Sequence, residues 1–353
     1  MSVIKIASRE IGPHSPPFVI AEMSGNHNQS LERALAIVDA AAKAGAHAIK
    51  LQTYTADTMT LDLDTNEFHI ADPDSLWSGT SLYQLYRQAY TPWEWHQAIF
   101  ERANQLGVLA FSTPFDESAV DFLESLNVPA YKIASFENTD LPLIRKVAAT
   151  GKPMIISTGM ASASELDETV RAAREAGCKD LILLKCTSTY PASPENTHLR
   201  TIPHLRELFN CEVGLSDHTM GVGVAVAAVA LGASVIEKHF TLSRADGGVD
   251  AAFSLEPDEL HLLVAESARA WQAMGEIKYG GSQSEEKSKV FRRSLYVVQD
   301  IKRGERLSEL NVRCIRPGLG LAPKYYNLVL GACAQYDLKK GQPLQFDAVI
   351  LNK

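Results

Sequence analysis

Two histidines end short apolar runs in the second half of the sequence. His218 lies in VGLSDHTMG (213–221) and His239 lies in VIEKHFTL (235–242). Each run has the length of a β-strand, and neighbouring strands of a sheet are about 4.8 Å apart. The two imidazoles could therefore bind one divalent cation, with positions left open for water and a substrate oxygen. For either histidine alone, a hydrogen-bonded role in the core is the alternative.

Polar side chains also end the other apolar runs. They are Glu22, Lys50, Gln52, Thr113, Lys132, Ser135, Ser157, Lys185, Ser216 and Glu237. Residues two positions apart on a strand share a face, so Glu237 is expected to point with His239. Buried lysines at positions 50 and 132 would need an anionic ligand or an internal carboxylate, such as Glu22 or Glu137. Hydroxyl groups around two lysines resemble a phosphate pocket.

These ends belong to eight alternating units of strand and helix. The strand candidates are FVIAEM (18–23), AIKLQT (48–53), LAFSTP (109–114), AYKIAS (130–135), MIISTG (154–159), LILLKC (181–186), EVGLSDH (212–218) and SVIEKHF (234–240). Eight such units predict a closed (β/α)8 TIM barrel, whose chemistry gathers at the carboxyl ends of the strands. An open doubly wound sheet is disfavoured, because the first turn, EMSGNHNQS, is not a glycine-rich phosphate loop.

The barrel is predicted to span residues 1–280. A polar linker follows at 281–292, and residues 293–353 form a small β-rich module with an internal repeat, DIKRGERL from Asp300 and DLKKGQPL from Asp337. The long insertion at 54–91 is predicted to form a lid or rim over the barrel mouth.

Composition restricts the classes of partner. The 353 residues carry a net charge of −8, and the part from Arg293 onward carries ten basic and five acidic residues, which leaves −13 for the remainder. This acidic body argues against nucleic acid as a partner. We expect no membrane span, since no apolar run is long enough. The five cysteines form no C-x-x-C pair, and together with the absence of an N-terminal signal they predict a cytoplasmic protein.

Two other readings remain open at this point. Lys185 could act as the Schiff-base lysine of an aldolase-like lyase, which would leave both histidines unexplained. The chain could also be a carbohydrate- or ice-binding module on an inert barrel. Cys186 is predicted to be a buried structural thiol rather than a nucleophile, because no histidine is predictably beside it.

Eight motifs in order carry a family resemblance. IAEMSGNHNQ, IKLQTYT, FSTPFD, YKIASFEN, ISTGMAS, KCTSTYP, GLSDHT and IEKHFTL resemble the sialic acid synthase family. FRRSLYVVQDIKRGE and IRPGLGL are similar to that family's C-terminal antifreeze-like (SAF, β-clip) domain. AEMSGNHNQ, KLQTYTADTMTLD and YKIASFENTDLPLI look most like the pseudaminic acid branch rather than the N-acetylneuraminic or legionaminic branches.

The resemblance implies condensation of phosphoenolpyruvate with an open-chain amino-sugar aldehyde and water, which gives a nine-carbon 2-keto acid and phosphate. In the pseudaminic branch the sugar is 2,4-diacetamido-2,4,6-trideoxy-β-L-altrose. The family relationship also implies that His218 and His239 hold a divalent metal, Mn²⁺ or Mg²⁺, which polarises the aldehyde oxygen.

The remaining roles also follow from the resemblance. The residues implied to surround phosphoenolpyruvate are Thr113, Lys132, Ser135, Ser157 and Ser216, with Lys50 near its carboxylate. Those implied to face the sugar and the metal-bound water are Glu22, Gln52, Tyr190 and Asp250. Glu137 and Glu237 are both candidates for moving the proton of the attacking water. Ser188 stands where the neuraminic branch usually has asparagine, and Asp246 competes with Asp250.

The resemblance further implies a domain-swapped homodimer. Arg316, in IRPGLGL, would then reach the sugar in the partner's barrel. An ordinary surface arginine is the alternative.

Overall fold

The computed structural model describes residues 3–351 as two compact units, one ending at Gly275 and the other beginning at Glu276. Eight parallel strands of the first unit close into a barrel in the order β10-β3-β4-β5-β6-β7-β8-β9. They are β3 (Phe18–Glu22), β4 (Ala48–Thr53), β5 (Leu109–Pro114), β6 (Tyr131–Ile133), β7 (Met154–Ser157), β8 (Leu181–Cys186), β9 (Glu212–Asp217) and β10 (Val235–His239). The predicted (β/α)8 TIM barrel is confirmed.

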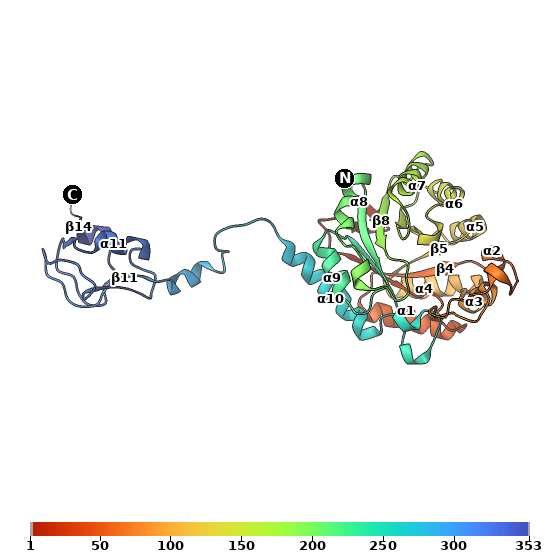
Figure 1. The fold of residues 1–353 in the computed structure, drawn as a ribbon, viewed down its shortest axis with the longest axis horizontal. Coiled ribbons are helices and arrows are strands. Elements are labelled where there is room, and N and C mark those ends of the chain that lie inside the picture. The colour runs from red at the N-terminus through yellow and green to blue at the C-terminus, as the bar shows by residue number, and fades with distance from the viewer. Residues whose placement is uncertain (1–2, 352–353) are drawn as a thin grey trace. The chain divides into compact units, whose positions relative to one another are not determined.

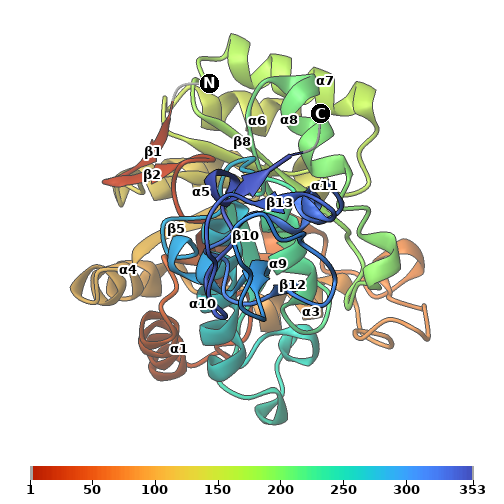
Figure 2. The ribbon, with the colours of Figure 1, turned by 90° about the vertical axis from the view of Figure 1, so that its left-hand side faces the viewer.

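Helices cover the outside of this barrel (Figure 1). They are α1 (Leu31–Ala44), α4 (His96–Gln105), α5 (Glu117–Ser125), α6 (Leu141–Ala148), α7 (Ala163–Glu175), α8 (Thr201–Phe209), α9 (Gly223–Ala230) and α10 (Pro257–Met274). Local sequence sets their ends: the Ser30 hydroxyl accepts a hydrogen bond from Arg33 N at the start of α1, and Gly45 ends it with a φ of 89°. Helix α1 packs beside α4, and α6 beside α7 (Figure 2).

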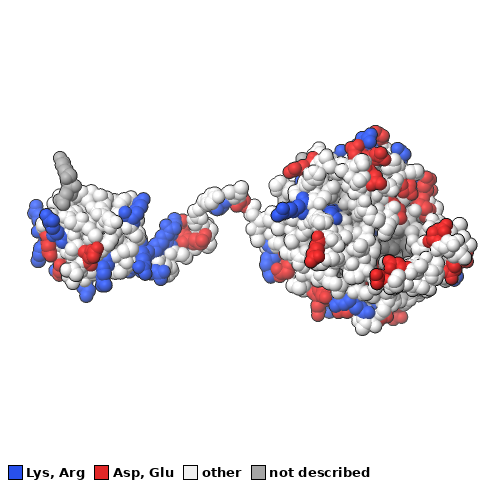
Figure 3. Space-filling model, viewed as in Figure 1, with Lys and Arg blue, Asp and Glu red and all other residues white. Residues whose placement is uncertain are grey.

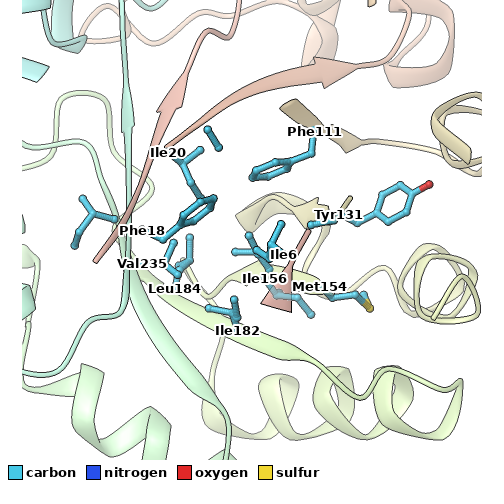
Figure 4. Close-up of a cluster of buried hydrophobic side chains, with 14 of the residues drawn as sticks. Ile6, Phe18, Ile20, Phe111, Tyr131, Met154, Ile156, Ile182, Leu184 and Val235 are labelled. Carbon is cyan, nitrogen blue, oxygen red and sulfur yellow. The ribbon is translucent and has the colours of Figure 1, made fainter. Parts of the chain in front are cut away.

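The inward face of the strands changes from apolar to polar along their length. Figure 4 shows one buried apolar cluster that includes Phe18, Ile20, Phe111, Ile182, Leu184 and Val235. Glu22, Thr113 and Glu237 follow members of this cluster by two positions and so share their faces. Polar groups therefore gather at the carboxyl ends of the strands. The N-terminal hairpin of β1 (Ile4–Ile6) and β2 (Arg9–Ile11) adds three isoleucines to the core.

The insertion at 54–91 lies against loops at the carboxyl end of the barrel. Its helices are α2 (Ala56–Met59) and α3 (Leu82–Ala89). Trp77 Nε1 donates to Val249 O over 2.8 Å, and Gln29 Nε2 donates to two carbonyl oxygens of the insertion over 3.0 and 2.7 Å. These bonds attach the insertion to the loops that follow β10 and β3.

The second unit has its own core and uses the internal repeat reciprocally. Its elements are β11 (Ser294–Val297), β12 (Val312–Ile315), α11 (Tyr326–Val329), β13 (Cys333–Ala334) and β14 (Val349–Ile350). Lys302 Nζ lies 3.0 Å from the Asp337 carboxylate, and Lys339 Nζ lies 2.9 Å from that of Asp300. The aspartate of each repeat therefore forms an ion pair with a lysine of the other repeat.

The surface charge of the second unit agrees with the excess of basic residues counted in its sequence. Figure 3 shows Lys and Arg side chains gathered on the second unit, which carries the basic residues counted above. No helix among the described residues is both long enough and apolar enough to span a membrane. All five cysteines are free thiols.

Candidate active site

Strand register brings the predicted site residues to one mouth of the barrel. Glu22 pairs with Lys50 across β3 and β4, and Gln52 pairs with Thr113 across β4 and β5. Paired residues of parallel strands point to the same face. The Gln52 amide donates to Glu22 Oε1 over 3.1 Å, so these side chains meet inside the barrel.

The first lysine of the mouth is held by a carboxylate and a hydroxyl. Lys50 Nζ lies 2.5 Å from Glu22 Oε2 and donates to Thr113 Oγ1 over 3.0 Å, and it lies 4.0 Å from Glu237 Oε2. Burial acts to lower the pKa of Lys50, but the two carboxylates outweigh burial and raise it. Lys50 is therefore a buried cation at the base of the mouth.

The second lysine is less well compensated. Lys132 Nζ donates to Ser157 Oγ over 2.6 Å and to a backbone carbonyl over 3.1 Å. Its nearest carboxylate atom, Glu237 Oε1, is 3.7 Å away and also accepts from Ser216 Oγ over 3.2 Å. Burial lowers the pKa of Lys132 despite this carboxylate. An anion bound beside Lys132 would stabilise its charge.

A close backbone approach brings two serine hydroxyls to Gly159, two residues after Ser157. Gly159 N donates to Ser135 Oγ over 3.2 Å. A Cβ atom built on Gly159 would lie 2.1 Å from Ser188 Oγ and 2.6 Å from Ser135 Oγ, so any larger residue here would displace both hydroxyls. The Asn138 amide donates to the carbonyls of Ser157 and Gly159 over 3.2 and 3.1 Å and fixes this turn.

The two predicted metal ligands are neighbours. The ring centroids of His218 and His239 are 5.3 Å apart. His218 Nδ1 lies 2.9 Å from Thr187 O, so that nitrogen carries the proton and Nε2 is left as a lone-pair donor. His239 Nδ1 is buried and has no hydrogen-bond partner within residues 3–351. Burial, followed by the charge of His218, lowers the pKa of His239 well below its usual range, which keeps that ring neutral.

Aromatic rings and one aspartate enclose this histidine pair. Tyr190 lies over His218 with ring centroids 4.4 Å apart, and Phe253 lies 4.9 Å from His239. The Asp250 carboxylate is 3.8 Å from His239 Nδ1 and accepts a hydrogen bond from Ser24. Asp246 is exposed and pairs instead with Arg33 at 2.8 Å. The structure thus brings Asp250, and not Asp246, to the histidines.

The donor set fits a metal ion with an open coordination sphere. Burial acts to lower the pKa of His218, but hydrogen bonding to Cys186 and to Thr187 O outweighs burial and raises it, so this ring must lose a proton before its Nε2 can bind a metal. The unpartnered Nδ1 of His239 and the deprotonated Nε2 of His218 are then a suitable pair of ligands for a divalent ion. Within the described part of the chain, no group of three or more His, Cys, Asp and Glu side chains is arranged to hold a metal. The remaining ligands would have to be water and substrate oxygens.

Three carboxyl groups differ in protonation: those of Glu22 and Glu237, which are buried, and that of Glu137, which is half-buried. Burial raises the pKa of Glu22 and of Glu137 to about 7. Burial also acts to raise the pKa of Glu237, but Lys132 and Lys50 outweigh it and lower that pKa. Glu137 Oε2 has no hydrogen-bond partner among the described residues. Glu237 is thus ionised at neutral pH, whereas Glu137 can carry a proton near neutral pH.

Cys186 and Lys185 occupy opposite faces of β8. Cys186 is paired in register with the inward-pointing Ser216, and its Sγ lies 4.0 Å from His218 Nδ1. No pattern in the sequence predicted this histidine beside the thiol. Burial raises the pKa of Cys186, but hydrogen bonding to His218 lowers it to about 7. Lys185 must point outward, and its Nζ donates to Cys186 O over 2.7 Å.

Arg316 lies in the second unit. Its side chain is exposed, and it precedes Pro317 through a cis peptide bond. Its approach to a partner's barrel stays a prediction.

Two family profiles match the sequence. The NeuB family matches residues 37–279, and the SAF domain matches residues 292–350. The chain belongs to the NeuB family. This confirms the resemblance to sialic acid synthases and the SAF assignment of the C-terminal part.

NeuB-family relatives extend over nearly the whole chain. Pseudaminic acid synthase of Campylobacter jejuni is 48% identical over 93% of this chain and 95% of its own length. Pseudaminic acid synthase of Helicobacter pylori is 43% identical over 95% of this chain and 98% of its own length. N,N'-diacetyllegionaminic acid synthase of Campylobacter jejuni is 35% identical over 92% and 97%. Because these relatives are biosynthetic synthases, the chain is an enzyme of this family.

Solved structures of the family share the fold. N-acetylneuraminic acid synthetase from Leptospira borgpetersenii superposes with a TM-score of 0.72 at 32% identity, covering 81% of this chain and 95% of its own. The spore coat polysaccharide biosynthesis protein SpsE from Bacillus subtilis has a TM-score of 0.67 at 33% identity and covers both chains fully.

Sequence reasoning about this NeuB-family site missed four contributors. They are Ser24, Asn138, Gly159 and Cys186, which contact Asp250, the β7 turn, the serine hydroxyls and His218. A glycine two residues after a strand end was a usable signal for Gly159, because it permits close approach at a barrel mouth. The others are brought in by loops or by neighbouring strands, and no spacing in the sequence indicates them.

Proposed function

We propose that the chain catalyses the reaction of a pseudaminic acid synthase. Phosphoenolpyruvate, 2,4-diacetamido-2,4,6-trideoxy-β-L-altrose and water would give pseudaminic acid and phosphate, with cleavage of the C–O bond of phosphoenolpyruvate. The observation that carries the proposal is the neighbouring histidine pair beside two buried lysines in a NeuB-family barrel. The curated pseudaminic acid synthases at 43–48% identity support the branch.

Phosphoenolpyruvate fits the lysine side of the mouth. Nζ of Lys132, the weakly compensated buried cation, lies 2.6 Å from the Ser157 hydroxyl, and the hydroxyls of Ser135 and Ser188 lie at Gly159, two residues further along the chain. These donors suit a phosphate group. Lys50, which is already paired with Glu22, would receive the carboxylate end.

The sugar aldehyde fits the histidine side. His218 and His239 would hold a divalent metal, Mn²⁺ or Mg²⁺, which when bound supplies Lewis-acid polarisation of the aldehyde oxygen. Tyr190 lies over His218 and would orient the sugar, and Asp250 lies close enough to bond to a sugar hydroxyl or a metal-bound water. Glu22 and Gln52 would face the sugar from β3 and β4, the two strands that follow β10 around the barrel.

Glu137 is the better candidate for handling the proton of the attacking water. Its pKa of about 7 suits a group that gains and loses a proton near neutral pH. Glu237 is held ionised between two lysines and would instead keep both ammonium groups in place. The enzyme would then be a transferase of the phosphoenolpyruvate-dependent type.

The Schiff-base alternative has no support from the geometry. Lys185 points out of the barrel and bonds to a backbone carbonyl, so it cannot meet a substrate bound at the histidines. The legionaminic and N-acetylneuraminic reactions are the alternatives within the family, and their curated relatives are 33–35% identical to this chain. A cytoplasmic location and a domain-swapped homodimer, with Arg316 meeting the partner's sugar, complete the proposal.

A substrate panel tests the proposal. Phosphate release is measured with phosphoenolpyruvate, Mn²⁺ and sugars of altro and manno configuration that carry one or two acetamido groups. We expect the fastest turnover with the diacetamido altrose, loss of turnover with a chelator, and no turnover by His239→Ala. Faster turnover of a manno sugar would contradict the branch, and borohydride trapping of pyruvate on Lys185 would contradict the mechanism.

A further inference from the structure

A cavity of about 640 Å³ lies beside the catalytic mouth of the barrel unit. Its walls come from the loop after β3, the insertion at 54–91 and the loop after β10. They include the apolar side chains Leu76, Trp77, Leu85 and Val249 and the amides of Gln29 and Gln88. None of its twelve lining residues carries a charge, in contrast to the mouth with its lysines and carboxylates. We call this space the neutral cavity.

Trp77 lines the neutral cavity and also contacts an aromatic ring of the catalytic mouth. Its ring centroid lies 5.9 Å from that of Tyr190, which in turn covers His218. Its Nε1 donates to Val249 O over 2.8 Å, and the next residue, Asp250, reaches His239. A substrate bound over the histidines would therefore have Trp77 at its far end.

The cavity is built by close backbone contacts and does not need a ligand to form. A Cβ atom on Gly25 would lie 2.4 Å from Val249 Cγ2 and 3.0 Å from Ala89 Cα, so three segments meet there with no space to spare. Gln29 holds the insertion through hydrogen bonds of 3.0 and 2.7 Å to its backbone carbonyls. These contacts fix two walls of the cavity relative to each other.

The lining selects the chemistry of the occupant. A phosphate, carboxylate or ammonium group placed here would lose water without gaining an opposite charge. A neutral group with one hydrogen-bonding part and one methyl part matches a wall of amides, tryptophan and aliphatic side chains. An N-acetyl group has this composition.

We propose that the neutral cavity binds one N-acetyl group of the sugar substrate, and that this group packs against Trp77. The inference rests on the proposed function and adds to it the place where acylation of the sugar is recognised. Trp77 is then both a specificity residue and, through Tyr190 and Asp250, a positioning residue.

The test compares sugars and variants in the full-length, metal-loaded enzyme. The probes are the diacetamido sugar and two analogues, each with one acetamido group replaced by hydroxyl. We expect one analogue to be poorer than the parent sugar in kcat/KM by about 10- to 200-fold in the unchanged enzyme. In Trp77→Ala this preference should fall towards 1, with a rise in the sugar KM and no change in the phosphoenolpyruvate KM.

Two further variants separate packing from folding. Trp271→Phe is the matched control, because Trp271 is another half-buried tryptophan whose Nε1 donates to a backbone carbonyl, Pro13 O at 3.0 Å, and it lies far along the chain in α10. It should keep the preference. Leu85→Glu places a charge in the cavity without replacing the neighbour of Tyr190, and it should reduce the preference as Trp77→Ala does.

An unchanged preference in both Trp77→Ala and Leu85→Glu, with turnover retained, would overturn the subsite and leave the proposed function standing. Equal kcat/KM for all three sugars in the unchanged enzyme would overturn it as well. Phosphate release with none of the sugars would instead refute the proposed function itself, and the subsite with it.

Discussion

Replacing Glu137 by glutamine should stabilise the protein at alkaline pH while removing most of its activity. Glu137 is a half-buried residue whose Oε2 atom is buried and has no hydrogen-bond partner among the described residues. Burial raises its pKa from the ordinary value of 4.5 to about 7. The folded protein therefore binds this proton more tightly than the unfolded chain does.

The sign and size of the effect follow from linkage. Between pH 4.5 and about 7 the folded state holds more protons at this site, so the free energy of unfolding falls as the pH rises. At about 1.4 kcal/mol for each unit of pKa, the ionised carboxylate costs about 3 kcal/mol above pH 7. Glutamine carries no such cost. The variant should match the unchanged protein at pH 4.5 and exceed its free energy of unfolding by about 3 kcal/mol at pH 8.

Urea unfolding at pH 4.5, 6 and 8 measures this difference in the free energy of unfolding. Phosphate release measures activity, which should fall by about 100-fold or more if Glu137 moves the proton.

Glu237→Gln is the control, and its effect on stability should have the opposite sign. The pKa of Glu237 is lowered in the folded state, so its stabilisation is present above pH 4.5 and is lost as the pH falls through its folded pKa. Its removal should cost about 3–5 kcal/mol at pH 8. A difference for Glu137→Gln that does not change with pH would refute the reasoning.

Four further substitutions and one truncation test other parts of the protein. Gly159→Ala should raise the KM for phosphoenolpyruvate by about 10-fold or more. The new methyl group would lie 2.1 Å from Ser188 Oγ and 2.6 Å from Ser135 Oγ and would displace both hydroxyls. Unchanged kinetics would show that those hydroxyls do not bind the substrate. Asp250→Asn should lower kcat/KM by about 10-fold or more. The kcat/KM of Asp246→Asn, a change at an exposed residue, should lie within about twofold of that of the unchanged enzyme. A larger loss in Asp246→Asn than in Asp250→Asn would contradict the role given to Asp250. Arg316→Ala should raise the sugar KM or lower kcat, and truncation of the chain near residue 285 should do the same, so normal steady-state kinetics from the truncated protein would contradict the swapped dimer.

Local pattern was enough to predict the barrel and the direction of most site residues. Alternation with a period of two assigns each side chain to a face of its own strand, and the carboxyl ends of parallel strands must meet at one mouth. Glu22, Lys50 and His239 were found in this way, because nothing beyond their own strands was needed to orient them.

Distances between side chains on different elements were beyond the reach of the sequence. Glu137 and Glu237 are both glutamates near the mouth, and only the 3.7 and 4.0 Å separations of Glu237 from Lys132 and Lys50 decide which of the two is ionised. Loop paths also had to be known before Asp250 could be preferred to Asp246, since both lie on one short segment.

The order of residues along the chain thus determined eight strands, their polar ends and membership of a family of synthases. Closure of the barrel and the course of its loops decided protonation, the contact of Cys186 with His218, and the bond from Trp77 to Val249 across 172 positions of sequence. The physical reason is that a side chain's direction is a local property of the backbone, whereas its electrostatic surroundings are the sum of groups that only the folded chain brings together.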